Sequence, residues 1–193
     1  MIIIGLTGSI AMGKTTVAKQ FARLGIPVCD SDLIVHKLLA KNGKAVVKVA
    51  RVFPESLQND AIDRKILGKL VFGNDEKLKM LENILHPLVR DEQKKFIKQA
   101  VIKRKKLVIL DIPLLFETKA EERCNYVITV SAPYFLQKQR AMRRKNMTAE
   151  KFNNIIKRQM PDWKKRKLSN FVINTGMGKK FSLAMIIKIF NIF

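Results

Sequence analysis

The run Gly-Ser-Ile-Ala-Met-Gly-Lys-Thr at residues 8–15 is the feature that most constrains the fold of this chain. It matches the Gly-x4-Gly-Lys-Thr pattern of a phosphate-binding loop, in which two glycines let the backbone turn tightly and point its N–H groups at phosphate oxygens. The pattern predicts that Lys14 reaches the β- and γ-phosphates of a nucleotide and that the Thr15 hydroxyl is a ligand of Mg²⁺. The predicted nucleotide contacts in this segment are Gly8, Ser9, Ile10, Ala11, Met12, Gly13, Lys14, Thr15 and Thr16.

The residues on either side of the loop have the patterns of a strand and a helix. Residues 2–6 form an apolar run led by three isoleucines, which is typical of a buried parallel strand. After the loop, Val17, Phe21 and Leu24 fall at i, i+4 and i+7, and Gly25 is a stop signal. The segments therefore come in the order strand, loop, helix, and the positive end of the helix dipole adds to the predicted anion site.

Alternation of strands and helices along the chain predicts an α/β fold. The 193 residues, of which 47% are hydrophobic, contain no low-complexity tract or long linker, and suit one domain with inserted segments. We expect a three-layer arrangement, in which helices flank a parallel sheet of about five strands. The predicted strands lie near residues 2–6, 26–29, 107–111, 126–130 and 171–174.

Acidic residues follow two of these strands. Asp30 and Asp32 come directly after strand 26–29, at the edge where open α/β sheets bind their ligands. One of the two is expected to cap the helix that follows, which leaves the other for chemistry. Asp111 ends strand 107–111 as the acid of a Walker B strand does, and we expect it to hold Mg²⁺ through water. The alternative is that Asp111 only caps the next element.

Three arginines lie within five residues after strand 126–130. Arg140 and Arg144 are one helical turn apart and are predicted to share a face of one helix, with Arg143 beside them. Clustered guanidinium groups suit the charge of a transferring phosphoryl group. Simple solvation is the alternative for any arginine of so basic a chain.

Charge and cysteine content limit the partners and the compartment. The formal net charge is +22, from 38 Lys and Arg against 16 Asp and Glu. Lysine outnumbers arginine and aromatic residues make up only 7%, so we interpret the charge first as diffuse surface charge and second as an attraction for anionic nucleotides. A nucleic-acid partner is the third interpretation, and we expect no specific one. Cys29 and Cys124 stand far apart, which favours free thiols in the reducing cytoplasm.

The two ends of the chain also bear on its location. Strand 2–6 begins almost at the first residue, so we expect no cleaved signal peptide. The apolar segment 181–193 is too short to span a membrane and contains Lys188, and it is predicted to be a helix packed on the core.

Several further motifs occur in a characteristic order, and together with the phosphate loop they resemble those of the dephospho-coenzyme A kinase family. The resemblance extends from Gly8 to Gly176, almost the whole chain. The motifs that carry it are Asp30-Ser31-Asp32, Ile62-Asp63-Arg64 with Val71-Phe72, His86-Pro87, Pro113-Leu114-Leu115-Phe116-Glu117, Gln137-x-x-Arg140-x-x-x-Arg144, Arg158-Gln159 and Asn174-Thr175-Gly176.

The resemblance implies a P-loop kinase that transfers the γ-phosphate of ATP, with Mg²⁺, to the 3′-hydroxyl of dephospho-coenzyme A. That reaction, the last step of coenzyme A synthesis, gives coenzyme A and ADP. The family's architecture implies a core made of residues 1–31, 106–135 and 166–193, a helical coenzyme A-binding subdomain at about 32–105 and a lid at about 136–165. A monomer or weak homo-oligomer is expected.

The same resemblance implies roles for individual residues. Asp32 would be the general base, Lys14 and Arg140 would act on the transferred phosphate, and Arg140 and Arg144 would reach the phosphates from the lid. Asn174 and Gly176 would lie near the adenine of ATP. The candidates for contacts with the acceptor substrate are Asp32, Arg64, Phe72, His86, Leu115 and Phe116.

For several of these acceptor residues a purely structural role is the alternative. Arg64 could form a surface salt bridge and His86 could stand at a helix start before proline. Phe72 and Phe116 could fill the core.

The chain departs from the family pattern within the phosphate loop. Where the family usually has Gly-Gly-Ile-Gly-Ser-Gly-Lys, this chain has Ser9, Ala11 and Met12 at three positions. Acids that the family often has are replaced by Lys145 and Asn170. Two other functions stay open at this point: a nucleoside monophosphate kinase, which shares the core and the lid arginines, and a nucleotide-dependent protein that binds nucleic acid.

Overall fold

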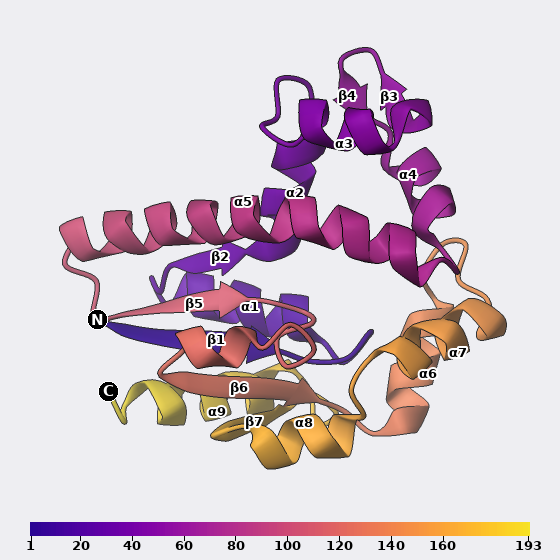
Figure 1. Cartoon of the computed structure of the whole chain (residues 1–193). Helices are drawn as coiled ribbons and strands as arrows, with labels where there is room; N and C mark the ends of the chain where they lie inside the picture. The colour runs from indigo at the N-terminus through magenta and orange to yellow at the C-terminus, as the bar shows by residue number, and fades with distance from the viewer. The chain divides into compact units, whose positions relative to one another are not determined.

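The computed structural model describes residues 1–193, and the chain divides into two compact units. The core unit consists of Met1–Cys29 and Ala100–Phe193, and the helical unit consists of Asp30–Gln99. Figure 1 follows the chain through these segments by colour. None of the helices is both long enough and apolar enough to cross a membrane.

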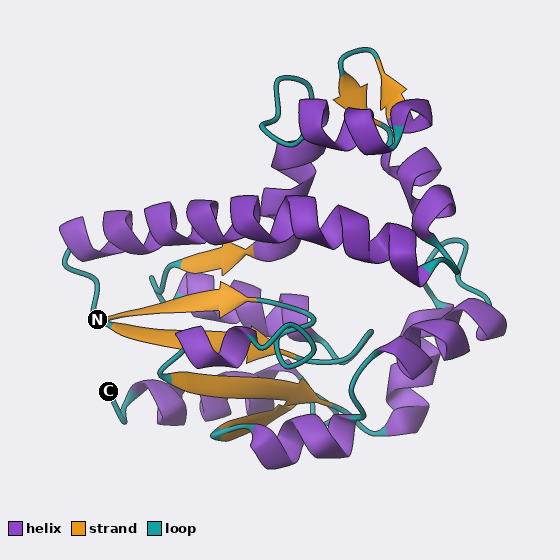
Figure 2. Ribbon diagram, viewed as in Figure 1, coloured by secondary structure: helices purple, strands orange, loops and turns teal.

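Five strands form the main sheet, in the spatial order β2-β5-β1-β6-β7 (Figure 2). The registers show that β1 runs parallel to β5 and β6, and that β6 runs parallel to β7. This arrangement confirms the predicted α/β fold, with each strand within one or two residues of its expected place. The bounds are β1 Ile2–Thr7, β2 Val28–Asp30, β5 Leu107–Asp111, β6 Tyr126–Ser131 and β7 Phe171–Asn174.

Helices α1 (Lys14–Arg23) and α9 (Lys179–Phe190) cover one face of this sheet. Val17 and Phe21 of α1 and Ile186 of α9 are buried in a single apolar cluster with alternate residues of β1, β5, β6 and β7. The segment near the C-terminus is therefore a helix packed on the core, as its composition predicts.

Helix α8 (Asp162–Leu168) packs on the opposite face, against β6. Since successive side chains of a strand point to opposite faces, Thr129 points away from the cluster that buries Ile128 and Val130. Its hydroxyl lies 2.5 Å from Oγ of Ser169, just after α8. The remaining elements of the core unit are η2 (Ala120–Arg123), α6 (Tyr134–Met142) and α7 (Ala149–Arg158).

The helical unit has an apolar core of its own, which includes Leu38, Val49, Phe53, Leu67 and Leu85. It contains α2 (Ser31–Leu39), α3 (Val46–Val52), η1 (Pro54–Ser56), the hairpin of β3 (Leu57–Gln58) and β4 (Ala61–Ile62), α4 (Arg64–Val71) and most of α5 (Asp75–Ile102).

Helix α5 continues through His86 and Pro87 without a break. The interpretation of His86 as a residue at a helix start is therefore wrong, because the helix begins at Asp75. An interior proline removes one backbone donor and crowds the carbonyl group four residues earlier, and the helix nevertheless continues to Ile102.

Candidate active site

The phosphate loop connects the end of β1 at Thr7 to the start of α1 at Lys14. Gly13 has a φ of 95°, in the left-handed region that favours glycine, and a Cβ there would lie 3.0 to 3.2 Å from the side chain of Thr175. A Cβ on Gly8 would lie 2.6 Å from the carbonyl oxygen of Val130. Close packing on the backbone therefore favours glycine at position 8, and the left-handed turn favours it at position 13.

Ala11 also adopts a left-handed conformation, with a φ of 60°. For a residue with a Cβ this conformation costs about 1–2 kcal/mol relative to the right-handed one. The structure thus places an alanine where the backbone favours glycine, at one of the positions where this chain departs from the family pattern.

Lys14 and Asp111 form an ion pair, with Nζ and Oδ1 2.5 Å apart. Asp111 is the last residue of β5, and the parallel register places it opposite Leu6 of β1, just before the phosphate loop. The side chain of Asp111 is almost fully buried, so its carboxylate is held at the edge of the sheet beside the loop.

Thr15 and Asp111 offer oxygen donors of the kind that Mg²⁺ binds. The structure has no group of three or more His, Cys, Asp or Glu side chains that could hold a metal ion by themselves. Mg²⁺ does not need such a group, because it usually keeps several waters and binds one or two protein oxygens together with phosphate oxygens. A hydroxyl and a carboxylate therefore fit this ion.

Arg140 lies near the end of α6 and binds Thr175, in the loop after β7. Its Nη1 donates to Oγ1 of Thr175 and its Nη2 donates to the carbonyl oxygen, each at 2.9 Å. The Thr175 hydroxyl in turn donates to the carbonyl oxygen of Met12 at 2.6 Å. Thr175 therefore connects the arginine to the phosphate loop, a role that sequence analysis missed because its only signal is the place between Asn174 and Gly176.

Asn174 and Gly176 lie in the same loop as Thr175. The Asn174 Oδ1 accepts the backbone N–H of Gly176 at 2.8 Å, which closes a tight turn. A Cβ on Gly176 would lie 2.7 Å from Cδ of Pro133. The predicted adenine contacts thus form a compact turn next to the residue that binds Arg140.

Arg144 does not share a helix face with Arg140, which corrects the sequence prediction. Helix α6 ends at Met142, and Arg143 and Arg144 lie beyond it, both exposed. The chain turns there through Asn146, whose φ of 61° is left-handed. Asparagine tolerates this conformation, and the helix has already ended within the arginine cluster.

Two glutamines from the predicted lid segment bind Ile10 of the phosphate loop. Gln137 of α6 donates from Nε2 to the carbonyl oxygen of Ile10, and Gln159, the residue after α7, accepts the N–H of Ile10 at Oε1, each at 2.9 Å. Both glutamines also line a cavity of about 470 Å³, whose lining includes Ser9, Met12 and Asn174.

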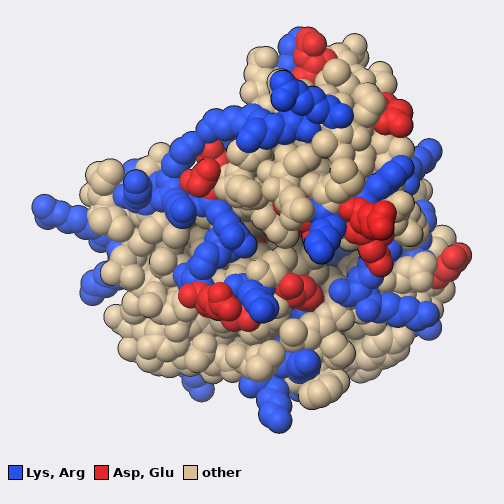
Figure 3. Space-filling view, viewed as in Figure 1, with Lys and Arg blue, Asp and Glu red and all other residues tan.

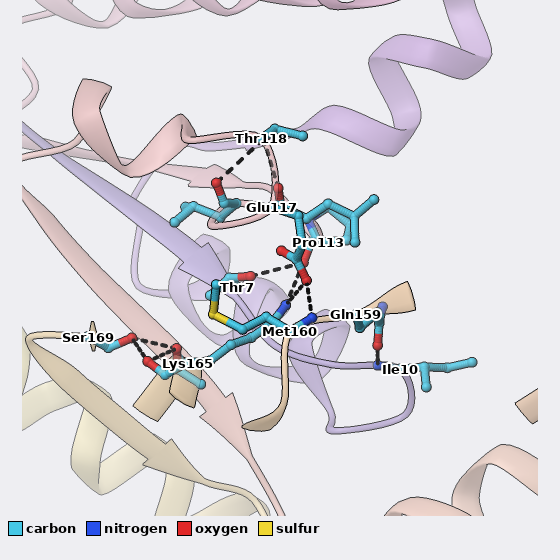
Figure 4. Close-up of polar contacts among 12 residues, drawn as sticks. Thr7, Ile10, Pro113, Glu117, Thr118, Gln159, Met160, Lys165 and Ser169 are labelled. Carbon is cyan, nitrogen blue, oxygen red and sulfur yellow. Dashed lines mark hydrogen bonds and ion pairs between the residues drawn. The ribbon is translucent and has the colours of Figure 1, made fainter. Parts of the chain in front are cut away.

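A buried ion pair stands next to Gln159 (Figure 4). Lys165 of α8 is completely buried, and its Nζ lies 2.8 Å from Oε1 of Glu117. The same carboxylate oxygen accepts the backbone N–H of Met160 at 2.8 Å. The motif Pro113–Glu117 therefore fixes the chain just after α7, and Leu115 within it is fully buried beside Gly5. Leu115 is predicted only as an acceptor contact, whereas the burial of Phe116 agrees with its alternative role in the core.

In the helical unit the two aspartates of the Asp30-Ser31-Asp32 motif have different surroundings. Asp30 caps α2, since its Oδ1 accepts the N–H of Leu33 at 3.0 Å. Ser31 is buried and accepts a hydrogen bond from Nε2 of Gln93 at 3.0 Å. Asp32 is exposed in the first turn of α2. The cap is therefore Asp30, which leaves the Asp32 carboxylate to other chemistry.

Arg64 binds His36 in the same unit, with Nη1 2.9 Å from Nδ1. Because a guanidinium group only donates, Nδ1 of His36 is the acceptor and carries no proton. His36 lies four residues after Asp32 on α2, so the two side chains share a helix face. Among the other acceptor candidates, Phe72 is 59% exposed and His86 is half-buried.

On the face that Figure 3 shows, basic side chains are spread rather than gathered in one patch. Figure 3 shows Lys and Arg side chains over much of the face in view, with Asp and Glu groups among them.

In the helical unit, hydrogen bonds from Lys44 and Lys95 lower the pKa of Glu92 to about 2. In the core unit, burial raises the pKa of the Cys124 thiol to about 11.

Comparison with known proteins gives one consistent family. Residues 2–179 match the family model described as dephospho-CoA kinase. A dephospho-CoA kinase of Rhodospirillum rubrum is 50% identical over 182 residues, which cover 94% of this chain and 86% of that protein. A second one, from Paramagnetospirillum magneticum, is 50% identical over 166 residues, covering 86% of this chain and 78% of that protein.

Solved structures agree with this match. A protein from Thermus thermophilus superimposes with a TM-score of 0.83 at 35% identity, covering 98% of this chain and 96% of that one. The dephospho-CoA kinase from Campylobacter jejuni has a TM-score of 0.66 at 27% identity, covering 98% and 95%. A shikimate kinase from Acinetobacter baumannii, at 20% identity and a TM-score of 0.54, covers 100% of this chain and 92% of that one and shares the fold.

Proposed function

The chain belongs to the dephospho-CoA kinase family, and we propose that it transfers the γ-phosphate of ATP to the 3′-hydroxyl of dephospho-coenzyme A. The observation that carries the proposal is the family match over residues 2–179. The matched segment contains an intact phosphate loop, and its Lys14 forms an ion pair with Asp111. The products are coenzyme A and ADP.

Phosphoryl transfer depends on positioning and on neutralising charge, because its transition state is loose and forms little new bonding. We assign the binding of the phosphates to the backbone N–H groups of the loop and the N-terminus of α1. The Lys14 ammonium supplies charge at the transferred phosphate. Arg140, which Thr175 holds beside the loop, supplies a second positive group.

Thr15 and Asp111 would hold Mg²⁺ in this proposal. When bound, the ion neutralises charge on the phosphate oxygens. Asp111 is also the partner of Lys14, so its carboxylate would serve both the ammonium group and the metal ion.

We assign the general base to Asp32. The acceptor is a ribose hydroxyl, whose proton must leave as the oxygen attacks phosphorus, and a carboxylate can take that proton. The capping role of Asp30 supports this assignment, because it leaves the neighbouring Asp32 carboxylate exposed and outside the helix cap.

We further propose that the helical unit binds the acceptor and that residues 136–165 act as a lid over the nucleotide. In the helical unit the candidates for acceptor contacts are Arg64, with its partner His36, and the exposed ring of Phe72. Closure of a lid would exclude water and limit the hydrolysis of ATP. Neither Cys29 nor Cys124 forms a disulfide, which supports a reducing, cytoplasmic location, and a monomer or weak homo-oligomer is our expectation for assembly.

An assay of ADP release with Mg²⁺ and ATP tests this function. The acceptors to compare are dephospho-coenzyme A, AMP, CMP, UMP and thymidylate, with each product checked by mass. We expect a gain of one phosphate on dephospho-coenzyme A alone. Turnover with nucleoside monophosphates only would contradict the proposal and would reduce Asp32 to a structural residue of α2.

A further inference from the structure

Ile10, the third residue of the phosphate loop, has both of its backbone polar groups bound by lid side chains. Its N–H donates to Oε1 of Gln159 and its carbonyl oxygen accepts from Nε2 of Gln137, each at 2.9 Å. These contacts join residues 149 and 127 positions apart in the sequence. A backbone N–H can only donate and a carbonyl can only accept, so the backbone fixes which end of each glutamine amide faces the loop.

The carbonyl that Gln137 binds belongs to the peptide group between Ile10 and Ala11. The orientation of that peptide plane sets the φ of Ala11, which is 60°. An alanine prefers to leave this left-handed conformation, whereas a glycine adopts it freely. The Gln137 hydrogen bond therefore opposes the relaxation of a strained residue inside the loop.

The second glutamine is itself fixed. Met160, the residue after Gln159, donates its N–H to Glu117, and Glu117 is paired with the fully buried Lys165 (Figure 4). Gln137 is buried on α6 with only 4% of its surface exposed. The backbone that carries Gln159 and the buried position of Gln137 are therefore both fixed within the core unit.

We propose that Gln137 and Gln159 are positioning residues that hold the Ile10–Ala11 peptide in the conformation that binds the nucleotide phosphates, and that they compensate for alanine at position 11. Neither side chain touches the reacting atoms in this proposal, and both act through the loop. The inference rests on the proposed function only in naming ATP as the ligand.

Substitution by glutamate separates this role from simple packing. Glutamate has the shape of glutamine but only accepts hydrogen bonds when ionised. Gln159→Glu keeps the acceptor that Ile10 N–H needs, whereas Gln137→Glu removes the donor and places a carboxylate against a carbonyl oxygen. A packing role alone would make the two substitutions equivalent.

The experiment measures the Kd of ATP with Mg²⁺ in the absence of acceptor, by calorimetric titration of the full chain, for Gln137→Ala, Gln137→Glu, Gln159→Ala and Gln159→Glu. The matched controls are Gln139→Ala and Gln139→Glu, on the exposed side of the same helix α6. We expect Gln137→Ala and Gln159→Ala to weaken ATP binding by about 3- to 10-fold, the net value of one hydrogen bond. Gln159→Glu should restore binding relative to Gln159→Ala, and Gln137→Glu should bind more weakly than Gln137→Ala.

The same series in an Ala11→Gly background tests the compensation. With glycine at position 11 the loop no longer resists its left-handed turn, so the loss caused by Gln137→Ala should shrink to about 2-fold or less. An equal loss in both backgrounds would overturn the compensation, and equal effects of the two glutamate variants would overturn the positioning role. If Gln137 variants fail to fold, as thermal unfolding would show, the Gln159 pair carries the test.

Kinetics separates this inference from the proposed function. In the variants we expect the KM for ATP to rise while kcat changes less, because the loop holds the nucleotide and the base lies elsewhere. If wild-type protein fails to phosphorylate dephospho-coenzyme A but the ATP-binding pattern holds, then the proposed function is wrong and the positioning role stands. If transfer occurs and the pattern is absent, the positioning role is wrong.

Discussion

The ammonium of Lys14 lies 2.5 Å from the carboxylate of Asp111, although 97 residues separate them in the sequence. The contact exists because β1 and β5 are parallel neighbours whose carboxyl ends reach the same edge of the sheet. Loop and acid are thereby brought together by strand pairing rather than by any local motif. The pair places one negative group beside the cation of the phosphate loop, where a nucleotide with its metal ion would be held.

Replacing Asp111 by asparagine should raise the requirement for Mg²⁺. The amide has nearly the same shape but lacks the charge that orients Lys14 and the metal's water ligands. We expect the Mg²⁺ concentration for half-maximal ADP release to rise by about 10-fold or more. Glu122→Gln, on the exposed surface of the same unit, is the control and should leave that concentration unchanged. An unaltered requirement in Asp111→Asn would remove Asp111 from the metal site.

Replacing Asp32 by asparagine should reduce kcat by about 100-fold or more, because the amide cannot accept the hydroxyl proton. ATP binding should change little. Asp30→Asn is the matched control: asparagine caps helices as well as aspartate does, so activity and stability should both be preserved. Equal losses of kcat in the two variants would show that the motif acts through structure and not through a base at Asp32.

Replacing Lys165 by methionine should destabilise the core unit by about 3–5 kcal/mol, since the substitution leaves the Glu117 carboxylate without its buried partner. Urea unfolding followed by the fluorescence of Trp163, on the same helix α8, measures this loss. Lys164→Met, one residue away on the exposed side of α8, should change the free energy of unfolding by less than about 0.5 kcal/mol. A similar small change for Lys165→Met would mean that the ion pair contributes little.

Glu92 should make stability of the helical unit depend on pH. Hydrogen bonds from Lys44 and Lys95 lower its pKa from the ordinary value of 4.5 to about 2, so the ionised form is favoured by folding. Its contribution is therefore fully present above pH 4.5 and is lost as the pH falls towards 2.

Comparison with Glu92→Gln measures this contribution. Because the pair is largely exposed, the difference in unfolding free energy at neutral pH should stay below about 1 kcal/mol. It should disappear at low pH and shrink in high salt. A difference that grows on acidification would contradict the assigned cause.

Local patterns in the sequence were sufficient for much of the fold. The β-branched run of β1, the glycines and Lys14 of the loop, and the apolar spacing of α1 each depend on neighbours within a few residues, and the structure confirms these elements. Arg144 shows the limit of this reasoning. Helix α6 ends at Met142, before Arg144, which the helical spacing of the arginines did not reveal.

The sequence by itself determined the strands, the phosphate loop and the identity of the acids that follow the strands, because hydrophobic periodicity and turn chemistry are short-range. Only the tertiary structure decided which of these residues meet. Several contacts join segments far apart in the chain. They are the hydrogen bond of Arg140 with Thr175, the ion pair of buried Lys165 with Glu117, and the hydrogen bonds of two glutamines with Ile10. Their partners are chosen by sheet order and helix packing, which no local pattern encodes.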